Sequence, residues 1–252
     1  NNVTVNWREC NPEELLGILL KNDFTVESIR TAMGDCFPGT SPLLGAEAAA
    51  VDYQALARLR IHQPDTNREA RRMPTDALQL FVLDDFMTAA ECDEVIDISA
   101  KNLRSSTVTT GDRDQGYRTS STCDLALLRD PFVKHIDRKI SRALGIRLPY
   151  SEGIQAQRYE VGQEFKAHTD FFAPGTTEYA NFASKGGNRT WTFMVFLNNV
   201  EQGGGTRFFA INTVLMPCKG TAVVWNNLHP DGTPNAQTVH AGLPVEKGHK
   251  II

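Results

Sequence analysis

The sequence lacks the cysteine pattern of a disulfide-stabilised or zinc-binding protein. Its five cysteines are scattered over 252 residues, and none of them forms a C-x-x-C pair. An odd number of widely spaced thiols favours reduced side chains over a disulfide framework. Buried, apolar thiols are the ordinary role of such residues. We therefore predict a cytoplasmic protein without structural disulfides.

Long apolar runs and an excess of basic residues are also missing. No run approaches the roughly 18 residues of a membrane-spanning helix, and no secretory signal is visible. The 26 lysines and arginines are outnumbered by 30 aspartates and glutamates, which gives a formal charge of −4. This balance lacks the basic footprint of a nucleic-acid-binding protein. We predict neither a membrane nor a nucleic-acid partner, and the sequence sets no oligomeric state.

Helical signals dominate the first part of the chain. Asn11 is followed by a proline and two glutamates, the pattern that opens a helix. Further helices are expected over Val26–Met33 and, in an alanine-rich stretch, over Ala46–Leu59. The polar stretch His62–Pro74 is typical of a linker. Residues 1–75 are therefore predicted to be a helical segment and linker, which either packs against the main domain or binds a partner.

Short strands dominate the second part, residues 76–252. A capping box at Thr88 and Glu91 and an amphipathic pattern over Pro131–Leu144 predict two helices. The strand candidates, separated by turn-forming residues, are Leu78–Leu83, Ile154–Val161, Thr190–Leu197, Thr206–Ala210, Thr221–Trp225 and Gln237–Ala241. Helices followed by many short strands predict an α+β, β-dominated fold. The expected form is an antiparallel double sheet, or jelly roll, braced by helices.

Three residues have the chemistry of an open metal site. His168 and Asp170 are two positions apart, so on an extended backbone both side chains point to the same side. That pair alone is a weak signal, but His240 supplies a second imidazole 70 residues after Asp170. Two histidines and one carboxylate leave three coordination positions open, as non-haem iron(II) requires for an organic cosubstrate and oxygen.

Lys250 stands ten residues after His240. A keto acid that chelates the metal leaves its distal carboxylate inside the protein, and burying that charge without a partner is costly. A lysine ammonium on a neighbouring strand would neutralise it.

Three sequence blocks that contain these residues resemble the prolyl 4-hydroxylase branch of the Fe(II)- and 2-oxoglutarate-dependent dioxygenases. The blocks are Gln155-x-x-x-Tyr159-x-x-Gly162-Gln163-x-Phe165-x-x-His168-x-Asp170, Gly203-Gly204-Gly205-Thr206-x-Phe208 and His240-Ala241-Gly242-x-Pro244-Val245-x-x-Gly248-x-Lys250. The resemblance covers residues 78 to 252. It implies that the jelly roll is a double-stranded β-helix.

The resemblance also implies a role for individual residues. His168, Asp170 and His240 would be the catalytic metal ligands, Lys250, Tyr159 and Thr206 would bind 2-oxoglutarate, and Arg189, Arg118 and Ser120 would contact substrate. Phe196 stands where many relatives have a tyrosine that faces the cosubstrate, so Tyr159 is expected to supply that hydroxyl alone.

The implied function is hydroxylation of an unactivated C–H bond, with Fe(II), 2-oxoglutarate, O2 and ascorbate as reductant. Prolyl 4-hydroxylation of a peptide or protein is the favoured reaction, and a free amino acid or other small molecule is the alternative substrate. Halogenating relatives have a small residue where Asp170 stands, so the carboxylate indicates hydroxylation. A different class, a non-catalytic metal-binding jelly roll with a partner-binding helical segment, also stays open.

Overall fold

The computed structural model describes residues 11–21, 24, 26–39, 41, 51–106, 117–183 and 187–252. The chain divides into two compact units, Asn1–Asp52 with Arg147–Ser151, and Tyr53–Ile146 with Glu152–Ile252. The domain boundary expected between residues 75 and 76 stays a prediction. Within the stretch expected as a linker, strand β1 (Arg71–Arg72) pairs with β2 (Leu80–Leu83).

The smaller unit contains two of the predicted helices. They are α1 (Pro12–Lys21) and α2 (Val26–Met33), and both predictions are confirmed. The Asn11 side chain accepts a hydrogen bond from the backbone of Glu13 at 3.0 Å, which satisfies one of the unpaired N–H groups at the helix start. Leu16 and Ile29 are buried in a small apolar cluster of this unit.

Of the alanine-rich helix expected over Ala46–Leu59, residues 46–50 lie outside the described residues. Within residues 51–59 only one turn, α3 (Tyr53–Leu56), is helical, so the prediction is wrong on either side of that turn. Downstream, the chain leaves the helical path to bury Ile61, whose carbonyl accepts a hydrogen bond from Ala70 at 2.9 Å. Tertiary pairing has here overridden a local helical preference.

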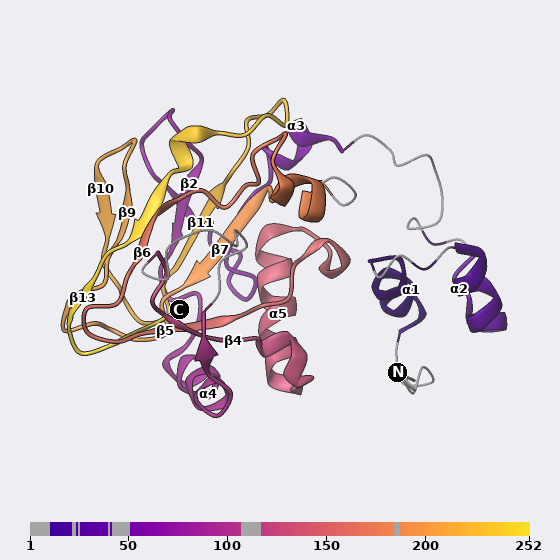
Figure 1. Ribbon diagram of the computed structural model, residues 1–252, viewed down its shortest axis with the longest axis horizontal. Coiled ribbons are helices and arrows are strands. Elements are labelled where there is room, and N and C mark those ends of the chain that lie inside the picture. Colours follow the sequence, from indigo (N-terminus) through magenta and orange to yellow (C-terminus); the bar gives the residue numbers. More distant parts are fainter. Residues whose placement is uncertain are drawn as a thin grey trace. The chain divides into compact units, whose positions relative to one another are not determined.

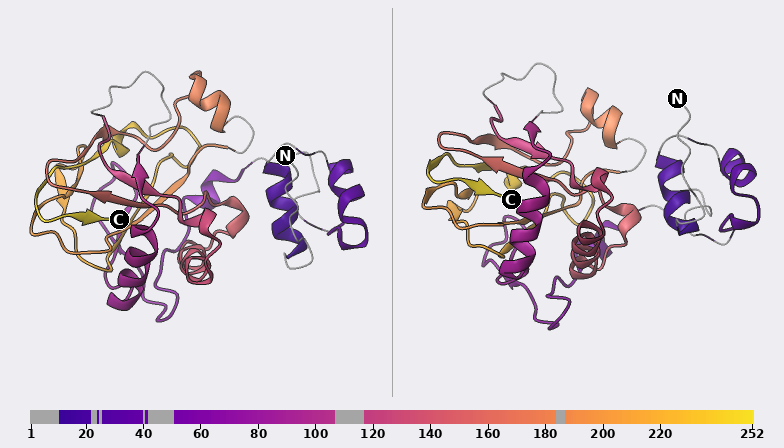
Figure 2. Two further views of the ribbon diagram at one scale, coloured as in Figure 1. Left: turned by 60° about the horizontal axis from the view of Figure 1, so that its bottom comes forward. Right: turned by 90° about the horizontal axis from the view of Figure 1, so that it is seen from below.

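Two longer helices brace the larger unit. In α4 (Ala89–Ala100), Thr88 and Glu91 form the predicted capping box, with hydrogen bonds of 2.7 and 3.1 Å. Helix α5 (Pro131–Leu144) begins after the capping side chain of Asp130 and ends at Gly145, which has a φ of +68°. Figure 1 shows both helices on one side of the strands β2, β11 and β7, and Figure 2 shows the same helices from below.

The strands form small antiparallel sheets. Their orders are β1-β2-β11-β7, β10-β9-β12-β6, β14-β5-β4-β3 and β13-β8. The remaining bounds are β3 (Arg104–Ser105), β4 (Ser121–Cys123), β5 (Ala156–Tyr159), β6 (Phe165–His168), β7 (Trp191–Val195), β8 (Gln202–Gly203), β9 (Thr206–Phe208), β10 (Thr213–Leu215), β11 (Ala222–Asn226), β12 (His240–Gly242), β13 (Val245–Lys247) and β14 (Lys250–Ile251). Single-turn or short helices are η2 (Gly34–Cys36), η3 (Leu125–Leu128), η4 (Leu148–Tyr150), η5 (Tyr179–Ala183) and η6 (Ala236–Thr238).

Strand β11 shows why two layers are needed. All five of its residues are buried, and successive side chains on a strand point to opposite faces. Ala222 and Val224 pack in the cluster that includes α4 and α5. Val223 and Trp225 pack on the other face with Phe208 of β9. The helices thus cover one face of this sheet and a second sheet covers the other.

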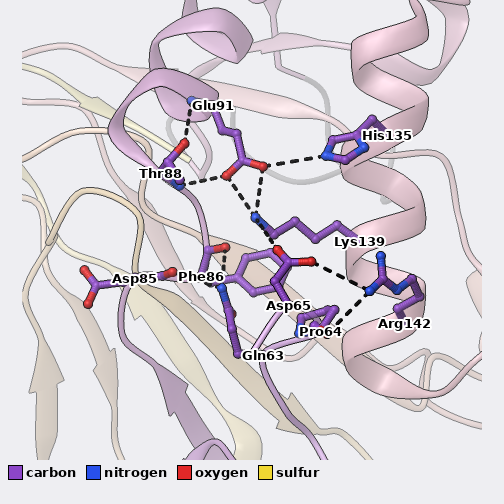
Figure 3. A network of polar contacts seen from close by, with 10 residues as sticks. All are labelled: Gln63, Pro64, Asp65, Asp85, Phe86, Thr88, Glu91, His135, Lys139 and Arg142. Carbon is purple, nitrogen blue, oxygen red and sulfur yellow. Dashed lines mark hydrogen bonds and ion pairs between the residues drawn. The ribbon is translucent and has the colours of Figure 1, made fainter. Parts of the chain in front are cut away.

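A buried ion pair joins α4 to α5 (Figure 3). The Lys139 ammonium donates to both carboxylate oxygens of Glu91 at 2.9 Å and lies 3.7 Å from Asp65. Burial alone would raise the pKa of Glu91, but Lys139 and the helix-capping hydrogen bond lower it below its usual value. Gln63 donates to the backbone carbonyl of Phe86 at 3.2 Å. The network therefore fastens the segment around residues 63–65 to both helices.

Gly220 allows a close approach of two backbone segments. Its φ is +85°, and a Cβ at this position would lie 2.2 Å from the carbonyl oxygen of Met87. Gly175 has a similar φ of +84°, but a Cβ there would meet nothing within 4 Å. We expect Gly220→Ala to lower the free energy of unfolding by about 1–3 kcal/mol more than Gly175→Ala, because only the first adds a clash to the φ strain. Urea unfolding of both variants measures the difference, and equal losses would contradict the predicted clash.

No helix in the described ranges is long and apolar enough to cross a membrane. Four of the cysteines, Cys36, Cys92, Cys123 and Cys218, are free thiols. Cys10 lies outside the described residues.

Candidate metal centre

The three predicted metal ligands meet at the end of two paired strands. His168 ends β6 and His240 begins β12, and the two residues lie directly opposite each other in the antiparallel ladder. Asp170 Oδ1 is 3.7 Å from His168 Nε2 and 3.9 Å from His240 Nε2. One ligand atom from each residue falls within 4.8 Å of the others, so the three could hold a metal ion.

Backbone carbonyls orient both imidazole rings. His168 Nδ1 lies 2.7 Å from the carbonyl oxygen of Lys166, and His240 Nδ1 lies 3.0 Å from that of Thr238. A carbonyl oxygen can only accept a hydrogen bond, so each Nδ1 carries the proton. In the neutral ring, Nε2 then keeps its lone pair, and each Nε2 faces Asp170. This tautomer is the one that binds a metal ion through Nε2.

The electrostatics of the site suit a cation. Burial, together with the neighbouring His240, lowers the pKa of His168 to about 4, so its imidazole is neutral at pH 7. Burial would raise the pKa of Asp170, but the two histidines, the Thr192 hydroxyl and Arg189 hold it below its usual value. The site thus offers a neutral imidazole at His168 and an ionised carboxylate at Asp170, the protonation states that metal binding requires of these two groups.

Aromatic rings surround the two histidines. The Phe165 ring stacks on His168 with centroids 3.6 Å apart, and the edge of Trp225 meets His240 at 4.8 Å. The Phe208 ring stacks on the same imidazole, that of His240, with centroids 5.5 Å apart. These contacts limit rotation of the imidazoles.

Lys250 is a buried cation next to this centre. It is only 2% exposed and lies opposite Tyr159 in the pairing of β14 with β5. Its Nζ is 5.1 Å from the Tyr159 ring centroid and 5.8 Å from that of Phe196. Burial lowers the pKa of Lys250 to about 8. Throughout the described part of the chain, no carboxylate forms an ion pair with it.

Glycines leave room around the Lys250 side chain. A Cβ on Gly242 would lie 3.6 Å from Lys250 Nζ, and a Cβ on Gly204 would lie 3.5 Å from its Cδ. Gly242 and His240 are two residues apart on β12, so their substituents share one face of the strand. Thr206, which is also buried, is paired with Gly242 across β9 and β12. Thr206, His168 and His240 therefore belong to one sheet, and the Lys250 ammonium reaches that sheet at Gly242.

Arg118 and Ser120, which were predicted to contact the substrate, both lie beside Tyr159. Arg118 Nε donates to Ser120 Oγ at 3.2 Å, and its guanidinium lies 4.9 Å from the Phe165 ring centroid. Burial raises the pKa of Tyr159, although Arg118 and Ser120 oppose that rise through hydrogen bonds. Tyr159 also donates to Gln157 Oε1 at 2.9 Å.

Arg189 is anchored beside Asp170. It donates to both oxygens of Glu152 at 2.5 and 2.8 Å, and its guanidinium lies 4.6 Å from the Phe172 ring centroid. Its Nη1 also donates to the backbone carbonyl of Asp170 at 3.4 Å. Neither Glu152 nor Phe172 stood out in the sequence.

Sequence reasoning also missed two polar residues behind Asp170. Thr192 Oγ1 donates to Asp170 Oδ2 at 2.5 Å, and Asn227 Nδ2 donates to Thr192 Oγ1 at 2.9 Å. Thr192 lies in β7 between Trp191 and Phe193, and Asn227 directly follows the buried strand β11. A polar side chain within or beside an otherwise apolar strand is the only local signal that either residue carries.

Comparison with known proteins identifies the family. Residues 154–252 match the model of the 2OG-Fe(II) oxygenase superfamily. The chain is 32% identical over 195 residues to the probable prolyl 4-hydroxylase 4 of Arabidopsis thaliana, which covers 68% of this chain and 64% of that protein. It thus spans just under two thirds of that relative. Probable prolyl 4-hydroxylase 3 of the same plant is 30% identical over 237 residues, which covers 83% of this chain and 80% of the relative.

A solved structure has the same fold. The viral collagen prolyl hydroxylase of Paramecium Bursaria Chlorella virus-1, in its 2OG complex, matches with a TM-score of 0.53 at 25% identity. The match covers 68% of this chain and 91% of that one. It confirms the predicted β-dominated double-stranded β-helix. The sequence identity to two prolyl 4-hydroxylases, the family match and this fold together show that the chain belongs to the prolyl 4-hydroxylase-like branch of the Fe(II)- and 2-oxoglutarate-dependent oxygenases.

Proposed function

We propose that this protein is an Fe(II)- and 2-oxoglutarate-dependent dioxygenase that hydroxylates prolyl residues of a peptide or protein. The observation that carries this proposal is the buried, unpaired Lys250 beside the two-histidine, one-carboxylate cluster. A metal cluster alone would fit many metalloproteins. A cation held without a partner next to it fits a cosubstrate that brings its own carboxylate.

His168, Asp170 and His240 would hold Fe(II), because their ligand atoms lie close together and, as two histidines and one carboxylate, leave coordination positions open. When bound, the metal, 2-oxoglutarate and O2 supply the oxidising chemistry, with succinate and CO2 as co-products and ascorbate as reductant. The protein's own contribution is to fix the ligands and to keep water away from them.

Lys250 would bind the distal carboxylate of 2-oxoglutarate. His240 and Gly242 are one repeat of the strand apart, about 7 Å, and Lys250 Nζ lies against Gly242. A five-carbon diacid can span that separation. The Tyr159 and Thr206 hydroxyls would be additional donors to the same group; the pairing of Tyr159 with Lys250 and of Thr206 with Gly242 supports this.

Arg118, Ser120 and Arg189 would contact the substrate near the metal ligands. Arg118 lies over Phe165, the ring that stacks on His168, and Arg189 holds the backbone of Asp170. The relatives named prolyl 4-hydroxylases support a prolyl substrate for this chain as well.

The test is a coupled product analysis with a panel of prolyl peptides, free proline and other free amino acids. We expect iron-dependent succinate release, and a peptide product that is heavier by one oxygen atom. A product from free amino acids alone would replace the prolyl peptide with a small-molecule substrate. Absence of iron-dependent succinate with every substrate would leave a non-catalytic metal-binding protein.

The pKa of Lys250 predicts how cosubstrate binding depends on pH. Burial lowers this pKa to about 8, so the ammonium is lost as the pH rises through about 8. We expect the KM for 2-oxoglutarate to rise above that pH while kcat at saturating 2-oxoglutarate changes less, since bound carboxylate favours the charged form. Measuring both constants between about pH 6.5 and 9.5 checks this. A KM that stays constant across the range would contradict it.

A further inference from the structure

We propose that Thr192 and Asn227 are positioning residues that make Asp170 bind the metal through a single oxygen. The inference rests on the proposed function, because it concerns how the same three ligands hold their ion. It concerns residues outside the three sequence blocks that mark the family.

The hydrogen bonds between these residues have one direction. Asn227 Nδ2 can only donate, so Thr192 Oγ1 accepts at 2.9 Å, and the single Thr192 proton is directed to Asp170 Oδ2 at 2.5 Å. A hydrogen bond to a charged acceptor at this length is strong. The relay therefore runs from Asn227 through Thr192 to Asp170.

The relay separates the two carboxylate oxygens of Asp170 by role. Oδ2 is occupied by the Thr192 hydroxyl, whereas Oδ1 faces both histidine Nε2 atoms at 3.7 and 3.9 Å. A carboxylate held in this way offers the metal one oxygen instead of two. The keto acid needs two coordination positions and oxygen needs one. With a single oxygen from Asp170, three positions stay open; a second oxygen would take one of them.

The burial of Asn227 supports a role other than stability. Its side chain is fully buried, yet Oδ1 accepts no hydrogen bond from any described residue. A buried amide with an unsatisfied carbonyl is unfavourable compared with an apolar side chain. The hydrogen bond from its NH2 group to Thr192 is therefore the interaction that explains an asparagine at this position.

The two residues come from neighbouring strands that are held in register. Thr192 of β7 is paired with Trp225 of β11, and Asn227 directly follows β11, two residues after Trp225. The backbone N–H of Asn227 donates to the backbone carbonyl of Thr190 at 2.7 Å. The backbone carbonyl of Asn227 accepts a hydrogen bond from the backbone N–H of Asn235 at 2.9 Å. The backbone thus fixes the amide independently of the metal ligands, as a positioning group requires.

The experiment measures binding of Co(II), a stand-in for Fe(II) that is stable in air, to metal-free protein by calorimetry and visible absorption. Thr192→Val removes the hydroxyl and keeps the shape, and we expect Co(II) affinity to fall roughly 10- to 100-fold. The visible spectrum should change as well, because Oδ2 becomes available as an additional ligand. Thr192→Ser, which retains the hydroxyl, should restore both properties. Asn227→Ala should show the same changes to a smaller extent, since the Thr192 hydroxyl remains.

Thr221→Val is the matched control. Thr221 is also buried and immediately precedes β11, but it lies opposite Phe196, away from Asp170. It should bind Co(II) like the wild type, and thermal unfolding of each metal-free variant separates loss of fold from loss of positioning. Unchanged affinity and spectrum in Thr192→Val, or an equal loss in Thr221→Val, would overturn the relay. Failure of the wild type to bind Co(II) would instead overturn the proposed function, and the relay with it.

Discussion

Replacing Asp170 by alanine should abolish iron-dependent succinate formation. The carboxylate is the only anionic group of the candidate centre, and its Oδ1 faces both histidine Nε2 atoms. Loss of a residue that merely orients a ligand already costs roughly 10- to 100-fold in metal affinity, so loss of the ligand itself should cost more than roughly 100-fold. Succinate release at several Fe(II) concentrations measures the effect.

Asp97→Ala is the control for this substitution, because Asp97 is an exposed carboxylate on α4. It should retain wild-type activity and wild-type dependence on Fe(II). If Asp170→Ala kept more than a tenth of the wild-type turnover at the same Fe(II) concentration, the assignment of Asp170 as a metal ligand would be refuted.

Replacing Lys250 by methionine should change stability and cosubstrate binding in opposite directions. Methionine keeps most of the side-chain length and removes the charge. Because burial lowers the pKa of Lys250 to about 8, the charged form destabilises the fold when no carboxylate is bound. The metal-free variant should therefore unfold at a temperature equal to or above that of the wild type at pH 7.

The same variant should bind 2-oxoglutarate much more weakly. Losing the partner of a buried charge costs about 2–5 kcal/mol, which corresponds to a rise of roughly 30-fold or more in the KM for 2-oxoglutarate. The matched control is Lys247→Met, since Lys247 is exposed and forms only a surface ion pair with Glu201 at 2.7 Å. It should change neither property. An unaltered KM in Lys250→Met would remove Lys250 from the cosubstrate site.

Three helix predictions show what local sequence can determine. The capping box at Thr88 and Glu91 and the proline at the start of α5 act through neighbours in the chain, and both helices form as expected. Of the helix expected over Ala46–Leu59, only α3 forms within the described residues 51–59, because burial of Ile61 and its pairing with Ala70 compete with helix formation there. Local propensity does not include that competition.

The candidate site divides in the same way. The sequence alone determined which residue types were available: the spacing of His168 and Asp170, the recurrence of His240 and the offset of Lys250 indicated an iron and 2-oxoglutarate site. Those residues can be recognised from the sequence because their side chains are suited to metal and carboxylate binding and their spacing is characteristic. Only the tertiary structure decided that His168 lies opposite His240 and that Lys250 is buried with no carboxylate of the described residues paired to it.

The tertiary structure alone also decided what stands behind the ligands. Thr192 and Asn227 are 35 residues apart in the sequence, and they meet Asp170 only because β7 pairs with β11. Threonine and asparagine are common residues whose roles depend on what lies next to them. Long-range strand pairing supplies those neighbours, and no short segment of the chain contains that information.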